Sequence, residues 1–226
     1  MKTFFTLTVL LLSIFMVFSC DALDPEEDPN ELGGDTNIPI AQVGNTAMTS
    51  FFLGDPDNVN DYGSVSASTE ITGKDNNGVV NVKLTADLSN YSDLYGVIPA
   101  ESKIGNNKIE CNLKFKMTSE GWQEYFFNKN QSPQVMFKYD CKVGDTYSFK
   151  QPDGTTITRK VTENTGQDDF QYGLMYIKTI KLEQNSTRPG IKKYIYRANH
   201  KFGLVYFQAV LEDGTSAGGY ITPYNY

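Results

Sequence analysis

The chain has 226 residues with a formal net charge of −7, and 39% of its residues are hydrophobic. Residues 1–42 contain one lysine and seven acidic residues, so this segment carries −6 of that charge and residues 43–226 carry only −1. The chain lacks a basic patch and a cluster of aromatic and arginine side chains, which argues against nucleic acid as a partner.

The N-terminus has the layout of an export signal. Lys2 precedes an apolar run from Phe4 to Phe18. This run is shorter than the ~20 residues that a membrane-spanning helix requires, which indicates a signal peptide. No later stretch of the sequence is apolar enough to span a bilayer. We therefore expect residues 1–19 to be removed from the mature protein.

The apolar run stops at a cysteine. The residues Val17-Phe18-Ser19-Cys20 resemble the lipobox of bacterial lipoproteins, with Phe18 bulkier than the usual occupant. The resemblance implies that Cys20 becomes the new N-terminus and carries a diacylglyceryl group and further acyl chains such as palmitate. Two or more chains anchor a protein stably to a membrane. Ordinary secretory cleavage near Cys20 is the alternative.

The segment after Cys20 is acidic and contains prolines and glycines. Such a composition buries too little apolar surface to fold, so we expect residues 20–42 to form a disordered tether. An acidic run after the lipidated cysteine also resembles the surface-export signal of lipoproteins in the Bacteroidota. The resemblance implies a protein anchored to the outer membrane and exposed on the cell surface.

Residues 43–226 have the pattern of one antiparallel all-β domain of roughly nine to eleven strands. Three turn dipeptides, Asn77-Gly78, Asp153-Gly154 and Asp213-Gly214, predict hairpins with two-residue turns. Runs rich in β-branched and aromatic residues predict strands at 79–86, 156–164, 174–183, 192–198 and 203–211. In the last run Val205, Phe207, Ala209 and Leu211 are expected on one face. The fold class is a β-sandwich or a strongly curved sheet or half-barrel.

Two further cysteines lie in alternating segments at 108–117 and 134–143. Period-two alternation places Cys111 and Cys141 on the core-facing sides of two strands. Because an exported protein meets oxidising conditions, we expect a disulfide between them. Two separate buried thiols are the alternative. Two cysteines without histidine partners are a poor metal site, and we expect no metal.

Residues 142–214 show a second, weaker resemblance. The strings KVGDTYSF, DGTTITRKV and ANHKFGLVYFQAVLEDG, with a strand between the last two, resemble a pattern in secreted bacterial lipoproteins of unassigned function. The resemblance implies a β fold and no particular activity.

Sequence motifs for catalysis are few. GTSAG around Ser216 matches a nucleophile elbow formally, but no histidine or acid follows it in the required order. The single histidine, His200, lies in a polar bend without an identifiable nucleophile. Asp168 and Asp169 are available as a carboxylate pair for a glycoside hydrolase. The loop 54–63 has oxygen ligands that suit calcium but fits no EF-hand.

Aromatic residues offer better binding candidates. Trp122 is the sole tryptophan, and Tyr194 and Tyr196 share one face of a predicted strand, where they would stack against a sugar or pack across strands. We expect a non-catalytic lipoprotein whose β domain presents a surface to a glycan or an envelope protein, without a cofactor. The first alternative is a periplasmic carrier that encloses an apolar ligand in a curved sheet. A carboxylate-dependent glycoside hydrolase is the third interpretation.

Overall fold

The structure is a computed structural model that describes residues 30–54, 65–89, 95, 102–125, 132–151 and 153–223. These residues form one short 3-10 helix and fifteen strands. In chain order they are η1 (Pro39–Ala41), β1 (Thr46–Gly54), β2 (Val65–Lys74), β3 (Val79–Asp87), β4 (Lys103–Gly105), β5 (Lys108–Met117), β6 (Gly121–Glu124), β7 (Gln134–Lys138), β8 (Thr146–Lys150), β9 (Thr156–Asn164), β10 (Phe170–Tyr172), β11 (Met175–Ile177), β12 (Ile180–Asn185), β13 (Ile191–Asn199), β14 (Gly203–Leu211) and β15 (Ser216–Pro223).

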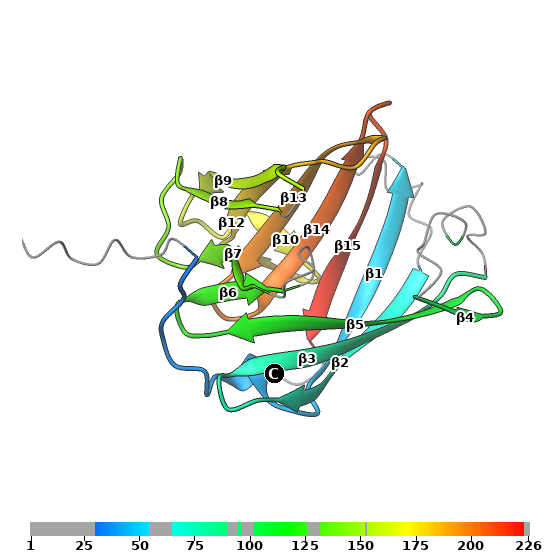
Figure 1. The fold of residues 1–226 in the computed structure, drawn as a ribbon, viewed down its shortest axis with the longest axis horizontal. Coiled ribbons are helices and arrows are strands. Elements are labelled where there is room, and N and C mark those ends of the chain that lie inside the picture. Colours follow the sequence, from blue (N-terminus) through cyan, green and yellow to red (C-terminus); the bar gives the residue numbers. More distant parts are fainter. Residues whose placement is uncertain are drawn as a thin grey trace, which may run out of the picture.

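Thirteen of these strands belong to one antiparallel sheet that curves into a nearly closed, barrel-like shape (Figure 1). The strand order is β7-β6-β5-β3-β2-β1-β15-β14-β13-β12-β9-β8, with β4 paired to β5, and β10 and β11 form a separate hairpin. The first and last strands of this order, β7 and β8, approach each other. This architecture confirms the predicted all-β fold with a strongly curved sheet. There are more strands than expected, partly because the predicted run 174–183 is divided between β11 and β12.

The three predicted turn dipeptides all connect antiparallel neighbours. Gly78, Gly154 and Gly214 have φ values of 79°, 89° and 91°, a region that glycine enters without steric cost. The loops are longer than the predicted two-residue turns, because residues 75–78, 151–155 and 212–215 separate the paired strands. An aspartate stabilises each loop: in the last one, Asp213 Oδ1 accepts hydrogen bonds from both the backbone and the hydroxyl of Thr215.

Alternation along the strands gives the sheet an inner and an outer face. The inner face holds a large cluster around Trp122, Phe137 and Leu182 and a smaller one around Val65 and Ile109. A third cluster lies on the outer face, where Tyr172 and Ile177 of the β10–β11 hairpin cover β1 and β14. The Tyr172 hydroxyl fastens this hairpin by donating to the carbonyl of Ile221, at 2.6 Å.

A bulge in β14 changes one predicted face. Arg197 pairs with Tyr206, but the next residue, Ala198, pairs with Leu204, so Val205 has no partner of its own. Val205 packs with the outer cluster and Leu204 with the inner one. The prediction that Val205 shares a face with Phe207 is therefore wrong, because an extra residue in a strand shifts the alternation.

The segment before β1 packs along one end of the sheet, past β6, β5 and β3 (Figure 1). We call residues 30–45 the N-terminal strap. Lys116 Nζ donates to the carbonyl of Leu32, Lys74 Nζ donates to that of Thr36, and Ser119 exchanges hydrogen bonds with Asp35. Leu32 and Ala41 are buried. The ordered body therefore begins by Asn30, within the segment predicted as a disordered tether.

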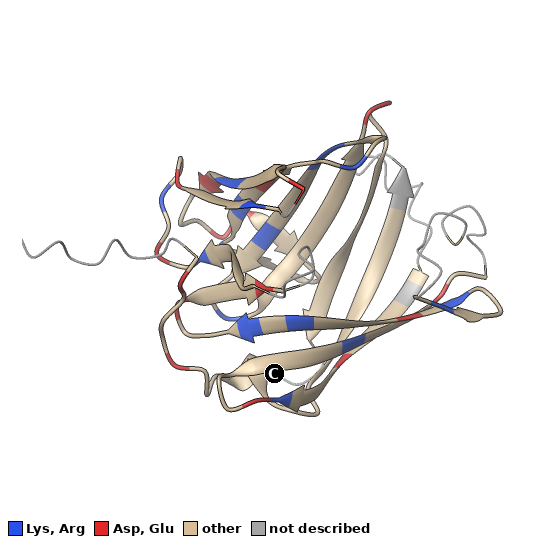
Figure 2. Ribbon diagram, viewed as in Figure 1, with Lys and Arg blue, Asp and Glu red and all other residues tan. Residues whose placement is uncertain are grey.

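Lys and Arg are interspersed with Asp and Glu along the strands and loops, and the view in Figure 2 shows no face of a single sign. The strands β1, β14 and β15 contain no charged residue. Over the described part of the chain, helices with the length and apolarity to cross a bilayer are absent.

Candidate functional site

The inner face of the barrel-like sheet lines a cavity of about 540 Å³ that is partly open to solvent. It lies where the inner faces of adjacent strands carry small side chains: Ala47 on β1, Ala209 on β14 and Ala217 on β15 all line it. Ala209 and Ala217 are directly paired across β14 and β15. These small side chains leave room in front of β1, β14 and β15 on the inner face of the sheet.

The wall of the cavity is predominantly apolar. Large apolar residues of this wall come from β2, β3, β5 and β14, with Leu88 directly after β3: Ile71, Val82, Leu84, Leu88, Ile109, Leu113, Phe115, Met117, Leu204 and Phe207. A cavity of this volume with an apolar wall and few polar groups is typical of small-molecule sites in proteins.

The N-terminal strap closes off one end of the cavity. Ile40 lines the cavity and packs with the inner cluster that contains Trp122. Gly203, at the start of β14, adopts a φ of 70°, and a Cβ there would lie 2.2 Å from Trp122 Cζ2 and 2.9 Å from Ile40 Cδ1. Glycine at this position therefore lets the strap, β6 and β14 meet closely.

The other end of the cavity is lined by Arg188 and Ile191, from the β12–β13 connection and the first residue of β13. The Arg188 side chain is exposed to solvent. It is the only basic residue among those described that line the cavity, and Glu70 is the only acidic one.

The three ligand-binding candidates from the sequence come together in this interior. Trp122, Tyr194 and Tyr196 all line the cavity, and the two tyrosine rings are stacked with centroids 6.5 Å apart. Trp122 is 6% exposed and Tyr196 is 9% exposed. Burial also raises the pKa of Tyr196 well above its usual range. These side chains therefore face the interior of the sheet, away from its outer surface.

A buried arginine joins the two ends of the strand order. Arg159 on β9 donates from Nη1 to the carbonyl of Val135 on β7, at 2.7 Å, and from Nε to Gln184 Oε1, also at 2.7 Å. Its Nη2 forms an ion pair with Glu124 on β6. Both charged side chains are at most 1% exposed. We call Arg159, Glu124 and Gln184 the seam cluster, because they connect β6 and β7 to β9 and β12.

The electrostatics of the seam cluster are dominated by burial. Removal from water raises the pKa of Glu124 to about 7, and the neighbouring Arg159 opposes this rise only in part. Sequence analysis did not single out this cluster. One signal was present, because Arg159 shares a strand face with the apolar residues Ile157 and Val161, and a charged residue on a core-facing position requires a buried partner.

The disulfide predicted between Cys111 and Cys141 is absent, and both are free thiols. Cys111 lies on β5, and Cys141 lies beyond the end of β7 rather than in a strand. Because β6 separates β5 from β7, Cys111 lies on a strand that is not a neighbour of the strand that Cys141 follows. Burial raises the pKa of Cys111, and that of Cys141 to about 11, so both thiols stay protonated.

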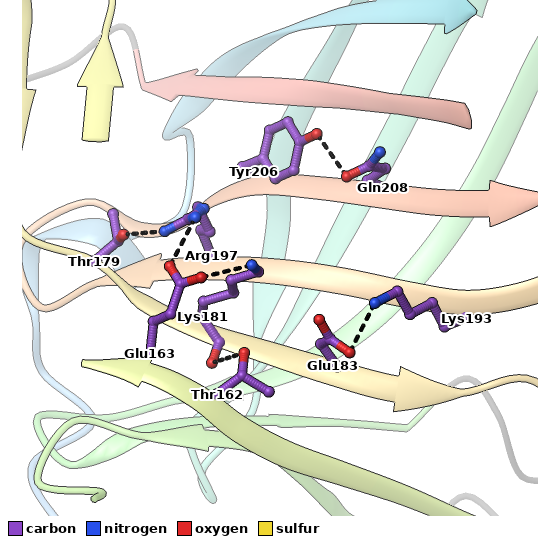
Figure 3. A network of polar contacts seen from close by, with 9 residues as sticks. All are labelled: Thr162, Glu163, Thr179, Lys181, Glu183, Lys193, Arg197, Tyr206 and Gln208. Carbon is purple, nitrogen blue, oxygen red and sulfur yellow. Dashed lines mark hydrogen bonds and ion pairs between the residues drawn. The ribbon is translucent and has the colours of Figure 1, made fainter. Parts of the chain in front are cut away.

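The outer face of β9, β12 and β13 carries a ladder of charges (Figure 3). Glu163 accepts hydrogen bonds from Lys181, at 2.6 Å, and from Arg197, at 3.0 Å, while Lys193 pairs with Glu183 at 2.8 Å. The hydrogen bond from Lys181 is the main reason that the pKa of Glu163 is lowered. These pairs join neighbouring strands, and their geometry is that of cross-strand stabilisation.

The remaining candidates lie apart from the cavity or outside the described residues. Ser216 begins a strand and accepts a hydrogen bond from Gln208, and His200 is exposed in a turn. Asp168 and Asp169 are exposed in a loop. Among described residues, no group of three or more His, Cys, Asp or Glu side chains gathers as metal ligands would. Cys20 and most of loop 54–63 lie outside the described residues.

Comparison with known proteins found no match for the chain among protein-family models, curated proteins or solved structures.

Proposed function

We propose that the protein binds an apolar small molecule inside its barrel-like sheet. The observation that carries this proposal is the cavity of about 540 Å³ with its apolar wall. The carrier hypothesis requires such an interior, whereas a module that binds glycans by stacking requires exposed aromatic side chains. The buried positions of Trp122 and Tyr196 favour the carrier.

We further propose that this carrier is a lipoprotein anchored through Cys20 to the outer membrane, with membrane contact through its acyl chains. The lipobox-like residues and the acidic run that follows them support this address. Since the ordered body begins by Asn30, the chain between Cys20 and the body spans at most ~35 Å. A carrier at this distance would exchange its ligand close to the bilayer surface.

The binding proposal predicts that the neutral dye N-phenyl-naphthylamine becomes fluorescent with the protein and is displaced by linear alkanes. Burial of each added methylene contributes ~0.8 kcal/mol to the binding free energy. We therefore expect the affinity to rise about fourfold per carbon until the cavity is full. The emission of Trp122, which lines the cavity, should change with the same midpoint.

A matched pair of variants tests whether the dye occupies the cavity. Ala217→Phe places a ring inside the hollow and should weaken dye binding by about tenfold or more. Asn112→Phe adds the same ring at an exposed position of β5 and should leave binding unchanged. Equal binding by both variants, or no dye binding by the parent protein, would contradict the proposal.

The lipoprotein proposal predicts that the mature protein begins at Cys20 and carries acyl mass. Intact-mass measurement and labelling of cells with a palmitate analogue should both be positive for the parent protein and negative for Cys20→Ser. Cys111→Ser is the matched control and should retain the label, because its thiol lies on a strand of the folded body. A mature protein without acyl mass would refute this address.

A further inference from the structure

Two buried polar atoms at the cavity wall have no hydrogen-bond partner among the described residues. They are Thr49 Oγ1 and Trp122 Nε1, on side chains that are 1% and 6% exposed. Both residues line the cavity. Buried polar atoms in folded proteins nearly always have a partner, and leaving one unpaired costs stability. These two atoms therefore mark positions at which a bound molecule would supply the missing partner.

Thr49 occupies the middle of an apolar wall. On β1 it lies between Ala47 and Phe51, which line the same cavity. Its cross-strand neighbours are Ile221 on β15 and Ala67 on β2. None of these side chains carries a hydrogen-bonding group. The Thr49 hydroxyl therefore has no partner on the neighbouring strands, and the residue lines the cavity.

Trp122 places a second donor on another wall. It belongs to β6, and β5, β3 and β2 lie between β6 and β1 in the sheet order. An indole N–H can only donate, and a hydroxyl can donate as well as accept. Both positions are therefore satisfied by acceptor oxygens on the ligand.

The charged residues of the cavity wall indicate whether the acceptor group of the ligand is neutral or ionised. Arg188 is the sole basic side chain among the described residues that line the cavity, and it is exposed at the opposite end from Ile40 and Trp122. An ionised carboxylate held at Thr49 would therefore be buried without a cation, which is strongly unfavourable.

Resting on the proposed function, we propose that the cavity is specific for a neutral oxygenated lipid: a long apolar chain with a ketone or ester oxygen along its length. Thr49 donates to this oxygen, and Trp122 donates to a second acceptor where the ligand has one. The apolar wall provides affinity, and the two donors set the position of the chain.

The test compares undecane with dipentyl ketone, which has the same number of carbons and one central oxygen, as competitors of N-phenyl-naphthylamine. Transfer of the ketone from water into hydrocarbon sets the affinity expected without a hydrogen bond. The parent protein should bind the ketone about threefold to tenfold more tightly than that, which is the contribution of one neutral hydrogen bond. Thr49→Val removes the hydroxyl and keeps the branched shape. It should lose this preference and bind undecane as the parent does.

A thermal melt of Thr49→Val separates loss of the donor from loss of the fold. Because the hydroxyl has no partner in the described structure, the variant should melt at the same temperature as the parent or higher. A ketone preference that persists in both Thr49→Val and Trp122→Phe would overturn the inference. So would tighter binding of undecanoate that depends on Arg188, tested with Arg188→Gln. If neither undecane nor the ketone displaces the dye, the proposed function itself fails.

Discussion

At about pH 8, Arg159→Met should lower the free energy of unfolding by about 3–5 kcal/mol, the usual cost of removing one partner of a buried ion pair. Glu124 is fully buried and pairs with Arg159. The substitution also removes the donors to Val135 and Gln184 that hold β9 to β7 and β12. Urea unfolding followed by Trp122 fluorescence measures the change, because Trp122 lies on β6 in the inner cluster.

The matched control is Lys181→Met. Lys181 also forms an ion pair, with Glu163, but both side chains are partly exposed, at 20% and 38%. Exposed pairs contribute ~1 kcal/mol or less, so this variant should be nearly as stable as the parent. The double variant Arg159→Met with Glu124→Met should recover much of the loss, because replacing a buried pair with apolar residues is often neutral. A loss below ~1 kcal/mol for Arg159→Met alone would contradict the assigned role of the seam cluster.

Glu124 should also make stability fall between about pH 4.5 and 7. Burial raises its pKa from 4.5 in the unfolded chain to about 7 in the folded protein. The folded state therefore binds the proton more tightly, so its contribution to stability is complete below pH 4.5 and is lost as the pH rises through 7. The loss amounts to at most about 3 kcal/mol, from 1.36 kcal/mol per pKa unit.

Glu124→Gln isolates this contribution, because glutamine has a similar shape and does not titrate. The stability difference between the parent and this variant should change with pH in the stated window and be constant on either side. The carboxylates of Asp87, Glu163 and Asp213 have lowered pKa values, so they act in the opposite direction and at lower pH, and they are common to both proteins. A difference that does not vary with pH would show that Glu124 is not titrating in this window.

The sequence by itself determined the all-β class, many of the strands and the positions of three hairpins, though not the lengths of their loops. Alternation and turn chemistry are local properties, and each strand needs only its own residues to reveal its period. For the same reason the run 203–211 was identified with the bounds of β14. The candidates Trp122, Tyr194 and Tyr196 were also chosen from the sequence. The sequence did not show that they lie on the inner surface of the sheet, where they line the cavity.

Only the tertiary structure decided which strands close on one another, and the candidate site depends on that closure. The cavity exists because small side chains of β1, β14 and β15 face larger ones of β3 and β5 across the curved sheet, and no local pattern records that juxtaposition. The same holds for Arg159 and Glu124, which lie 35 positions apart. The disulfide prediction failed for this reason: alternation placed Cys111 on a strand face but could not show that β6 separates that strand from β7. Local periodicity specifies the direction of a side chain, whereas the partner that it meets is specified by strand order and register.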